Sequence, residues 1–481
     1  MLPYAHPNIS LDVVEEIFKH LSPYALSEHD PGFKLLDAQG TPAVEVLWRE
    51  QDLIHACGVL PSFALASVRG PMIDADQYPQ DNDANDDWPE DGRNPHARNC
   101  LRPSTYYHLS GPISSEEWSR FQYYAHFIRS LYHDSSERLE STAFFYLRQH
   151  AHDTGNPLFP NLHKLEWGHV TPDLAMVISP SIRVLRIPER SSSHEDELDY
   201  RMRRHAFKTQ LPSVLRSLPN VETLELLRLG HEGFWHTFAP GPDHQFVAQN
   251  ISVLHISEPY SALMKGALAA VSTIQALTQL RIDVVLTSCS GDDGELKGWD
   301  KTRIRTFARL RCLQIKANMG QSGVLLDAIV APNLEDVEVK RDCESGPCKV
   351  PFSLPEALEP LGNRNVSSLR RVYLDLQNYY IPKPGDEPET EPIFLTLTKP
   401  LLQLRQLREL NIYIYPGADS SGPIDVALPA MLAAWPLLEH TKQRFLTDPH
   451  PTADAQSRGI PSHESTAADA SACTMRIVQP T

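Results

Sequence analysis

The chain has 481 residues, of which 41% are hydrophobic and 22% are charged, so it can bury a sizeable core and is not disordered as a whole. Its formal net charge of −17 argues against a nucleic-acid binder, which needs clustered Lys and Arg, and against docking to anionic membranes. No basic cluster precedes an apolar core at the N-terminus, and no apolar run approaches the roughly eighteen residues of a membrane span.

The first predicted helix spans residues 11–21, where Asp12 can cap the helix and Glu15 follows three residues later. Its apolar residues recur on one face, namely Val14, Ile17, Phe18 and Leu21. A second helical segment is predicted within residues 42–61. Residues 73–91 hold eight acidic residues and no basic one, which is typical of a solvated, mobile loop.

The most regular helical pattern lies in residues 114–131. Ser114 and Glu117 match a capping box, in which each side chain accepts a hydrogen bond from the other residue's backbone N–H. Trp118, Phe121, Ala125 and Ile128 follow at helical spacing and form an apolar stripe. We expect this stripe to pack in the core rather than to bind a ligand.

From residue 160 onward the chain repeats short phrases. Pro-Asn-apolar-x-x-apolar-Glu-apolar occurs three times, at 160–167, 219–226 and 332–339. The wider pattern apolar-x-x-apolar-x-apolar begins at Leu162, Ile182, Val221, Ile251, Leu277, Leu310, Leu334, Leu369 and Leu407. The mean step is about 31 residues, in the range of solenoid repeats.

Short helical phrases lie between these patterns, at 211–219, 324–332 and 426–436, so the predicted unit is strand, turn and helix. The Pro-Asn pair would turn the chain from a helix into the next strand. Because one unit cannot bury its own apolar edges, its neighbours must stack on it, which predicts a solenoid. An ordinary α/β domain with parallel strands remains an alternative, since its βα units look similar locally.

Residues 9–21, ISLDVVEEIFKHL, are similar to the first helix of an F-box. The phrases at 46–61, 106–131 and 156–170 resemble those that join the F-box to the repeats in the large fungal family of F-box proteins with irregular leucine-rich-like repeats. Ser10 stands where the F-box has proline, and residues 26–40 lack the Cys and Trp of its second half. The F-box is therefore incomplete.

This resemblance implies an α/β fold with a short N-terminal helical F-box-like region and an irregular leucine-rich-repeat-like solenoid of parallel strands and helices. It also implies a non-enzymatic adaptor, the substrate-recognition subunit of a Skp1–cullin–F-box ubiquitin ligase, whose repeats bind the substrate protein. The implied Skp1-binding residues are Ile9, Leu11, Val13, Val14, Ile17, Phe18 and Leu21. A stand-alone repeat scaffold that no longer binds Skp1 is the alternative.

The expected organisation has five parts. They are a partial F-box-like helical region (1–61), an acidic disordered linker (62–110), a helical connector that packs on the repeats (111–155), the leucine-rich-repeat-like domain (156–445) and a disordered tail (446–481). The seven cysteines are odd in number and include no Cys-x-x-Cys pair, which favours a reducing compartment. We therefore expect a cytoplasmic or nuclear protein.

Motifs of catalysis are not found in the sequence. HEGFWH at 231–236 places its two His five residues apart, whereas zinc proteases place them four apart on one helical face. A P-loop, Gly-x-Ser-x-Gly, Gly-x-Gly-x-x-Gly and kinase motifs are all missing. We expect no catalytic residue, no cofactor and no metal, although a hydrolase built on a parallel sheet stays open if polar side chains converge in one deep pocket.

The residues that alternate with the buried ones along each predicted strand would share one face of the sheet. They mix both charge signs with tyrosine, a residue enriched in binding hot spots. The candidate partner-binding residues are Arg281, Gln314, Glu338, Arg371, Tyr373, Asn411 and Tyr413. An ordinary solvated sheet face would have a similar composition.

Overall fold

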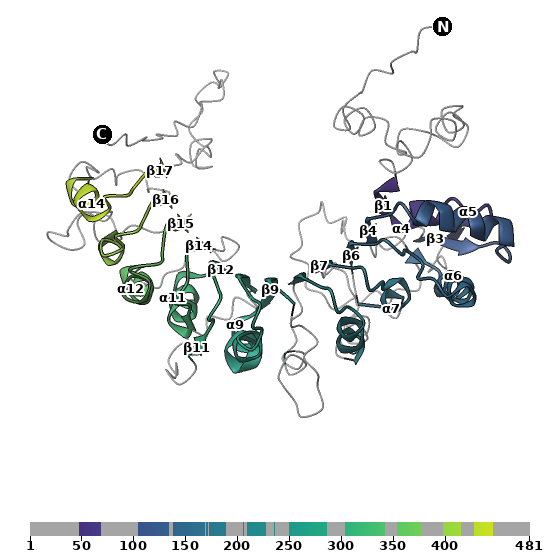
Figure 1. Cartoon of the computed structure of the whole chain (residues 1–481), viewed down its shortest axis with the longest axis horizontal. Coiled ribbons are helices and arrows are strands. Elements are labelled where there is room, and N and C mark those ends of the chain that lie inside the picture. Colours follow the sequence, from purple (N-terminus) through teal and green to yellow (C-terminus); the bar gives the residue numbers. More distant parts are fainter. Residues whose placement is uncertain are drawn as a thin grey trace, which may run out of the picture. The chain divides into compact units, whose positions relative to one another are not determined.

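The computed structural model of the chain divides into two units, Met1–Asn220 (unit 1) and Val221–Thr481 (unit 2). Each unit is α/β, with a parallel sheet and helices (Figure 1). The described residues are 48–68, 104–133, 138–168, 170–171, 173–188, 205, 209–227, 235, 250–285, 304–341, 354–376, 398–414 and 428–445. The division between the units lies inside the range 156–445 that we expected to form one domain.

Unit 1 contains a parallel sheet with strands in the order β1 (Glu50–Asp52), β4 (Ser130–His133), β6 (Lys164–Trp167) and β7 (Val184–Pro188). Its helices are α4 (Leu53–Cys57), α5 (Ser115–Ala125), α6 (Ser141–Thr154) and α7 (Leu174–Val177), and residues 209–216 are also helical. A smaller sheet pairs β2 (Phe63–Val68) antiparallel with β3 (Ser104–Leu109), and β3 parallel with β5 (Arg138–Leu139).

The predicted capping box of α5 is confirmed. The Ser114 hydroxyl accepts a hydrogen bond from Glu117 N at 3.2 Å, and Ser114 N donates to Glu117 Oε2 at 2.7 Å. The apolar stripe that begins at Trp118 is buried, as expected. The helix ends at Ala125, however, and the prediction of helix to residue 131 is wrong, because Ile128 and Leu131 enter the sheet as part of β4 and the turn before it.

Two other predictions for unit 1 need correction. Residues 42–61 do not form one helix where they are described, because β1 and α4 occupy 50–57, with β1 paired to β4. Leu53, Cys57 and Leu60 are buried. The strands β2 and β3 lie at the two ends of the range 62–110 that we expected to be a disordered linker. The predicted helix at 11–21 and the tail 446–481 lie outside the described residues.

Unit 2 contains a larger parallel sheet whose strands follow one another in chain order. They are β8 (Thr223–Leu227), β9 (Val253–Pro259), β10 (Gln279–Val285), β12 (Cys312–Ala317), β14 (Asp336–Arg341), β15 (Arg371–Leu376), β16 (Glu409–Ile414) and β17 (His440–Phe445). A short parallel pair, β11 (Arg305–Thr306) and β13 (Ile329–Val330), lies apart from this sheet.

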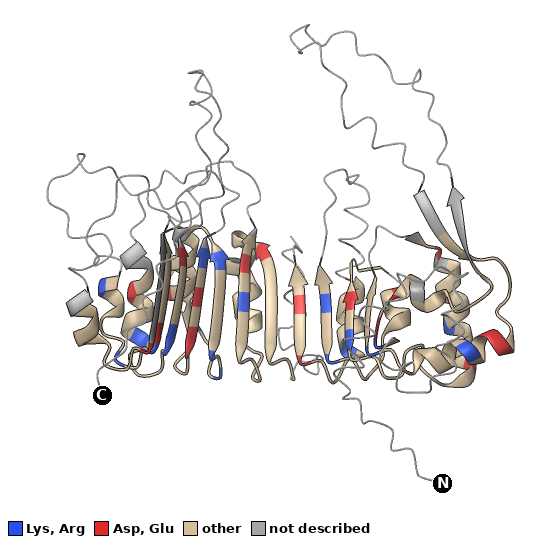
Figure 2. Ribbon diagram, turned by 90° about the horizontal axis from the view of Figure 1, so that it is seen from above, with Lys and Arg blue, Asp and Glu red and all other residues tan. Residues whose placement is uncertain are grey.

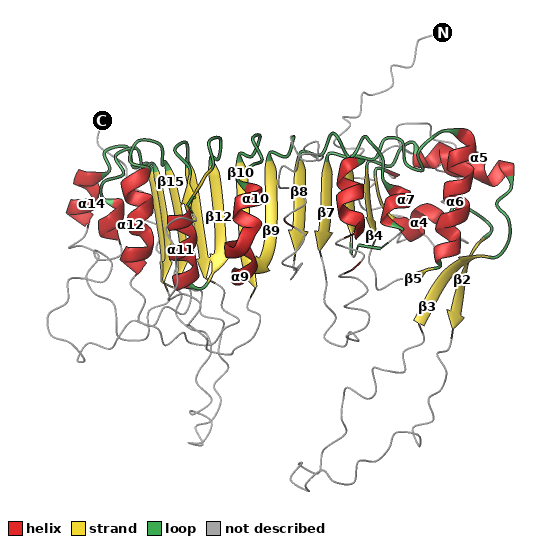
Figure 3. Ribbon diagram, turned by 90° about the horizontal axis from the view of Figure 1, so that it is seen from below, coloured by secondary structure: helices red, strands yellow, loops and turns green. Residues whose placement is uncertain are grey.

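The described helices of unit 2 lie on one face of its sheet (Figure 3). They are α9 (Tyr260–Ala262), η5 (Leu263–Ala267), α10 (Leu268–Val271), α11 (Met319–Ala328), α12 (Leu354–Arg364), η8 (Lys399–Leu401) and α14 (Leu428–Ala434). We call the opposite face the open face. Both Lys or Arg and Asp or Glu lie on the strands of this unit (Figure 2).

Ladders of aligned apolar side chains form the core between the sheet and the helices of unit 2. One buried ladder is Leu224, Leu254, Leu280, Leu313, Val337, Val372 and Leu410, and the next is Leu226, Ile256, Ile282, Ile315, Val339, Leu374 and Ile412. Fully burying each such side chain contributes about 1.5–3 kcal/mol. A strand follows each of the nine predicted positions from Leu162 to Leu407, so these nine strand predictions are confirmed.

The Pro-Asn phrases have a role that the sequence did not reveal. The Nδ2 atoms of Asn161, Asn220 and Asn333 donate hydrogen bonds of 2.8–2.9 Å to main-chain carbonyl oxygens. The acceptors are the carbonyl oxygens of His126, Pro180 and Ala308. Each acceptor lies two residues before an apolar residue that precedes a strand, and this strand comes earlier in the chain than the strand that follows the asparagine. Each asparagine therefore ties its own turn to the turn of an earlier strand.

Two details at the helix and strand ends of unit 2 complete the fold. Asn318 caps α11 by accepting a hydrogen bond from Gln321 N at 2.9 Å. Strand β17 pairs in parallel with β16, and its register places Thr441 and Gln443 opposite Leu410 and Ile412. On β17, polar residues therefore occupy the register positions that hold apolar ladder residues on the neighbouring strands.

Candidate functional site

The structure brings the candidate partner-binding residues together on the open face of unit 2. Backbone register aligns five of them in one row across β10, β12, β14, β15 and β16, namely Arg281, Gln314, Glu338, Tyr373 and Asn411. Arg371 lies in the neighbouring row, next to Asp336, and Tyr413 lies in the row beyond, next to Asp375. They share a face because side chains two residues apart on a strand point the same way.

Tyrosines and a lysine form one cluster on this face. The Tyr373 and Tyr413 rings have centroids 5.0 Å apart, and Lys340 Nζ lies 5.6 Å from the Tyr373 ring centroid. Lys340 Nζ also forms an ion pair with Glu338 Oε1 at 2.6 Å. Both tyrosines are half-buried, so part of each residue is exposed to solvent.

Polar pairs on either side of the tyrosines are set by the strand register. Arg371 donates two hydrogen bonds to the Asp336 carboxylate, one from Nε and one from an Nη. Asn411 donates to Glu409 Oε1 at 2.8 Å. The buried Asn411 Oδ1 accepts no hydrogen bond from any described residue.

A histidine-centred group, which the sequence analysis missed, lies on the strands at the other side of the same face. His255 Nε2 lies 3.0 Å from Asp283 Oδ2, and His255 Nδ1 lies 3.8 Å from Glu225 Oε2. Arg281 Nε donates to Asp283 Oδ1 at 3.2 Å. The alternation of Val253, His255 and Ser257 along β9 was the available signal.

The environment of this group shifts two pKa values in opposite directions. Burial alone would lower the pKa of His255, but the hydrogen bond to Asp283 and the nearby Glu225 carboxylate outweigh burial and raise it above its usual value. Burial alone would raise the pKa of Asp283, but hydrogen bonds from His255 and Arg281 hold it below the usual range. The imidazolium and the carboxylate therefore stabilise each other's charged forms.

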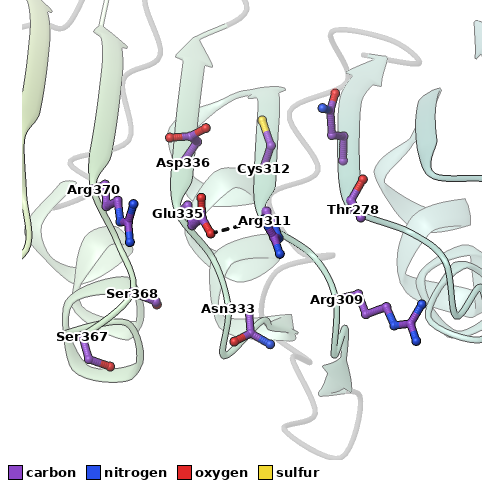
Figure 4. A pocket seen from close by; sticks show the side chains of 11 residues that line it. Thr278, Arg309, Arg311, Cys312, Asn333, Glu335, Asp336, Ser367, Ser368 and Arg370 are labelled. Carbon is purple, nitrogen blue, oxygen red and sulfur yellow. Dashed lines mark ion pairs between the residues drawn. The ribbon is translucent and has the colours of Figure 1, made fainter.

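A hollow of about 910 Å³ lies at the starts of β10, β12 and β14 and the turn before β15 (Figure 4). It is lined by Thr278, Gln279, Arg309, Arg311, Cys312, Asn333, Glu335, Asp336, Ser367, Ser368 and Arg370. Arg311 Nη1 lies 3.8 Å from Glu335 Oε1, whereas Arg309 points away from that pair in the view of Figure 4. The sequence analysis missed this hollow because most of its residues lie in turns, where no periodic pattern marks them.

A metal site, a membrane span and a reactive thiol each place requirements on the described residues. They contain no group of three or more His, Cys, Asp or Glu placed to hold a metal ion, and none of the described helices is long and apolar enough to cross a membrane. Burial, aided by Asp52, raises the pKa of the Cys57 thiol to about 12. Burial also raises the pKa of Cys312, with Asp336 and Glu338 contributing. Both thiols are therefore protonated and weakly nucleophilic at neutral pH.

No model of a known protein family matches the chain, and no curated protein matches it either. The residues implied to bind Skp1 by resemblance lie outside the described part of the chain; they are Ile9, Leu11, Val13, Val14, Ile17, Phe18 and Leu21. The candidates that the structure describes are those on the open face and in the hollow, and both belong to unit 2.

Proposed function

We propose that the chain is a non-enzymatic adaptor that binds a partner protein through the open face of unit 2. The observation that carries the proposal is the aligned row from Arg281 to Asn411, which combines both charge signs with the Tyr373 and Tyr413 rings. Tyrosine and arginine are the residue types that most often dominate binding energy at protein interfaces.

The size of the open face suits a protein partner better than a small molecule. Eight parallel strands spaced about 4.8 Å apart span about 34 Å, and a strand of six residues is about 20 Å long. The product, about 670 Å², is close to the roughly 800 Å² that each partner buries in a standard interface. Small-molecule sites are instead enclosed and mostly apolar.

We further propose that the repeated units form an irregular leucine-rich-repeat-like solenoid and that the N-terminal segment joins the chain to a ubiquitin ligase of the Skp1–cullin–F-box type. The chain order of the strands and the continuous apolar ladders support stacked units. The likeness of residues 9–21 to an F-box helix supports the link to Skp1. In this role the open face would hold the substrate.

Quantitative capture with the full chain tests the role of the open face. The double variant Tyr373→Ala/Tyr413→Ala should lose specific partner proteins by at least about tenfold, the effect of removing a hot spot of 1.4 kcal/mol or more. The matched control is Tyr123→Ala/Tyr146→Ala, which removes two exposed tyrosines from unit 1. If both double variants lose partner proteins equally, or if neither loses them, binding through the open face is contradicted.

A stand-alone scaffold without Skp1 contact is the second candidate. The replacement of the F-box proline by Ser10 and the polar residues 26–40 favour it. It predicts that the open face still captures partner proteins and that the full chain does not retain Skp1.

A further inference from the structure

The hollow of unit 2 lies along a continuous main-chain ladder just before the strands. Glu335 N donates to Arg311 O, Arg370 N to Glu335 O and Arg408 N to Arg370 O, each at 2.8 Å. These four residues therefore occupy successive places along one edge of the sheet, and their side chains are spaced by the separation of the strands, about 4.8 Å.

Positive charge predominates in this hollow, although the whole chain carries −17. Three arginines, Arg309, Arg311 and Arg370, face two carboxylates. One of these carboxylates, Asp336, is already bound by Arg371, which lies outside the lining. The other, Glu335, has only a long contact of 3.8 Å with Arg311. Arg309 and Arg370 form no ion pair with any described residue.

The spacing of the arginines selects among anionic ligands. Arg311 and Arg370 precede strands that are two places apart, so their main chains are about 9.6 Å apart. Glu335 lies between them and repels negative charge at the midpoint. A polyproline II segment has three residues per turn and rises about 3.1 Å per residue, so side chains three residues apart lie on the same side of the segment, about 9.3 Å apart. One compact phosphate group does not match this arrangement.

We propose that the hollow binds an extended acidic segment of the partner polypeptide in the polyproline II conformation, with carboxylates three residues apart paired to Arg311 and Arg370. The inference rests on the proposed function and names the chemistry of the partner that function requires. Arginine suits the role because its guanidinium donates two parallel hydrogen bonds to a carboxylate. The exposed Ser367 adds a hydroxyl at the edge of the site.

Fluorescence anisotropy with the full chain tests this inference. The probe is a short labelled peptide with Glu at every third position and Gly or Ser between. It should bind at low ionic strength and weaken as salt is added. Arg370→Glu should lower the affinity by about tenfold or more, because it replaces an attraction with a repulsion. The control Arg216→Glu reverses an exposed charge on the helical residues 209–216 of unit 1 and should leave the affinity unchanged.

Three outcomes would overturn the inference. They are equal binding of a peptide with Gln in place of Glu, equal weakening by Arg216→Glu, and tighter binding of a neutral peptide that carries one phosphoserine. Failure here is distinguishable from failure of the proposed function, because the capture experiment uses Tyr373 and Tyr413, which do not line the hollow.

Discussion

Asparagine side chains in the Pro-Asn turns contribute to stability through single hydrogen bonds. Asn333 Nδ2 donates to Ala308 O at 2.8 Å, and the bonds of Asn161 and Asn220 are equivalent. Removing a donor leaves a carbonyl without its partner, which costs about 1–3 kcal/mol when the carbonyl is buried and less when it is exposed. The repeat of Pro-Asn in the sequence is thus explained by contact between turns as well as by the change of chain direction.

Replacing this asparagine should therefore destabilise unit 2. Asn333→Ala and the isosteric Asn333→Asp should each lower the free energy of unfolding by about 1 kcal/mol, measured by urea denaturation. Asn156→Ala is the control, since the exposed side chain of Asn156 forms no hydrogen bond with a described residue. If Asn156→Ala lowers the free energy of unfolding as much as the two Asn333 variants do, the role of the turn hydrogen bond is refuted.

His255 should give the stability of unit 2 a pH dependence. Its folded-state pKa is raised above the unfolded value of 6.5, so its contribution is complete below pH 6.5 and is lost as pH rises through the raised value. Asp283 has a lowered pKa, so its contribution is present above its unfolded value of 3.8 and is lost as pH falls through the folded value.

A series of urea denaturations above pH 6.5 measures this effect. The free energy of unfolding should fall with rising pH in the unmodified chain, and His255→Gln should remove that part of the slope because glutamine does not titrate. If the slopes of the two proteins coincide, His255 is not held protonated by Asp283 and Glu225.

At the scale of elements, close packing between α12 and η8 depends on one glycine. A Cβ added to Gly362 would lie 2.2 Å from the main-chain oxygen of Pro400, far inside van der Waals contact. The nearby Gln403 Nε2 donates to Asn363 Oδ1 at 3.0 Å and to Pro400 O at 3.2 Å, which holds the two segments together. Any larger residue at position 362 must therefore push main chain apart.

Gly362→Ala should lower the free energy of unfolding by about 1–3 kcal/mol, the usual cost of overpacking. Gly266→Ala is a matched control in η5, where an added Cβ meets no atom within 4 Å. That change should be neutral or stabilise the chain by up to about 1 kcal/mol, because alanine favours helix over glycine. Thermal or urea denaturation measures both, and a Gly362→Ala protein as stable as the control would contradict the packing account.

At the scale of the whole molecule, the sequence predicted the elements whose residues bury a periodic apolar face. The nine strands that follow the positions from Leu162 to Leu407 obey this rule, since their apolar-x-x-apolar-x-apolar phrases must align to fill the ladders. Strand β1 was missed because its sequence Glu50-Gln51-Asp52 is polar, and β4 was missed because His133 stands in the last apolar position of its phrase. Both segments form strands because they pair with other strands in the folded chain, β1 with β4 and β4 with β6.

The candidate site was predictable to a similar degree. Alternation along known strands placed the row from Arg281 to Asn411, because position on a strand determines the face. The His255 group and the hollow depend on which strands become neighbours and on turn residues such as Arg309 and Ser367. Those contacts join residues far apart in sequence, so no local pattern predicts them.

The most direct test of the adaptor role is co-purification of the full chain with Skp1. We predict that the unmodified chain retains Skp1, that Ile17→Asp and Phe18→Asp each abolish retention, and that the control Leu437→Asp, which charges an exposed apolar residue of unit 2, does not. Deleting residues 1–47 should also abolish retention, while β1 and the buried residues of α4 stay in place. No retention by the unmodified chain, or retention unaffected by charging Ile17 and Phe18, would contradict a role as a ubiquitin-ligase adaptor.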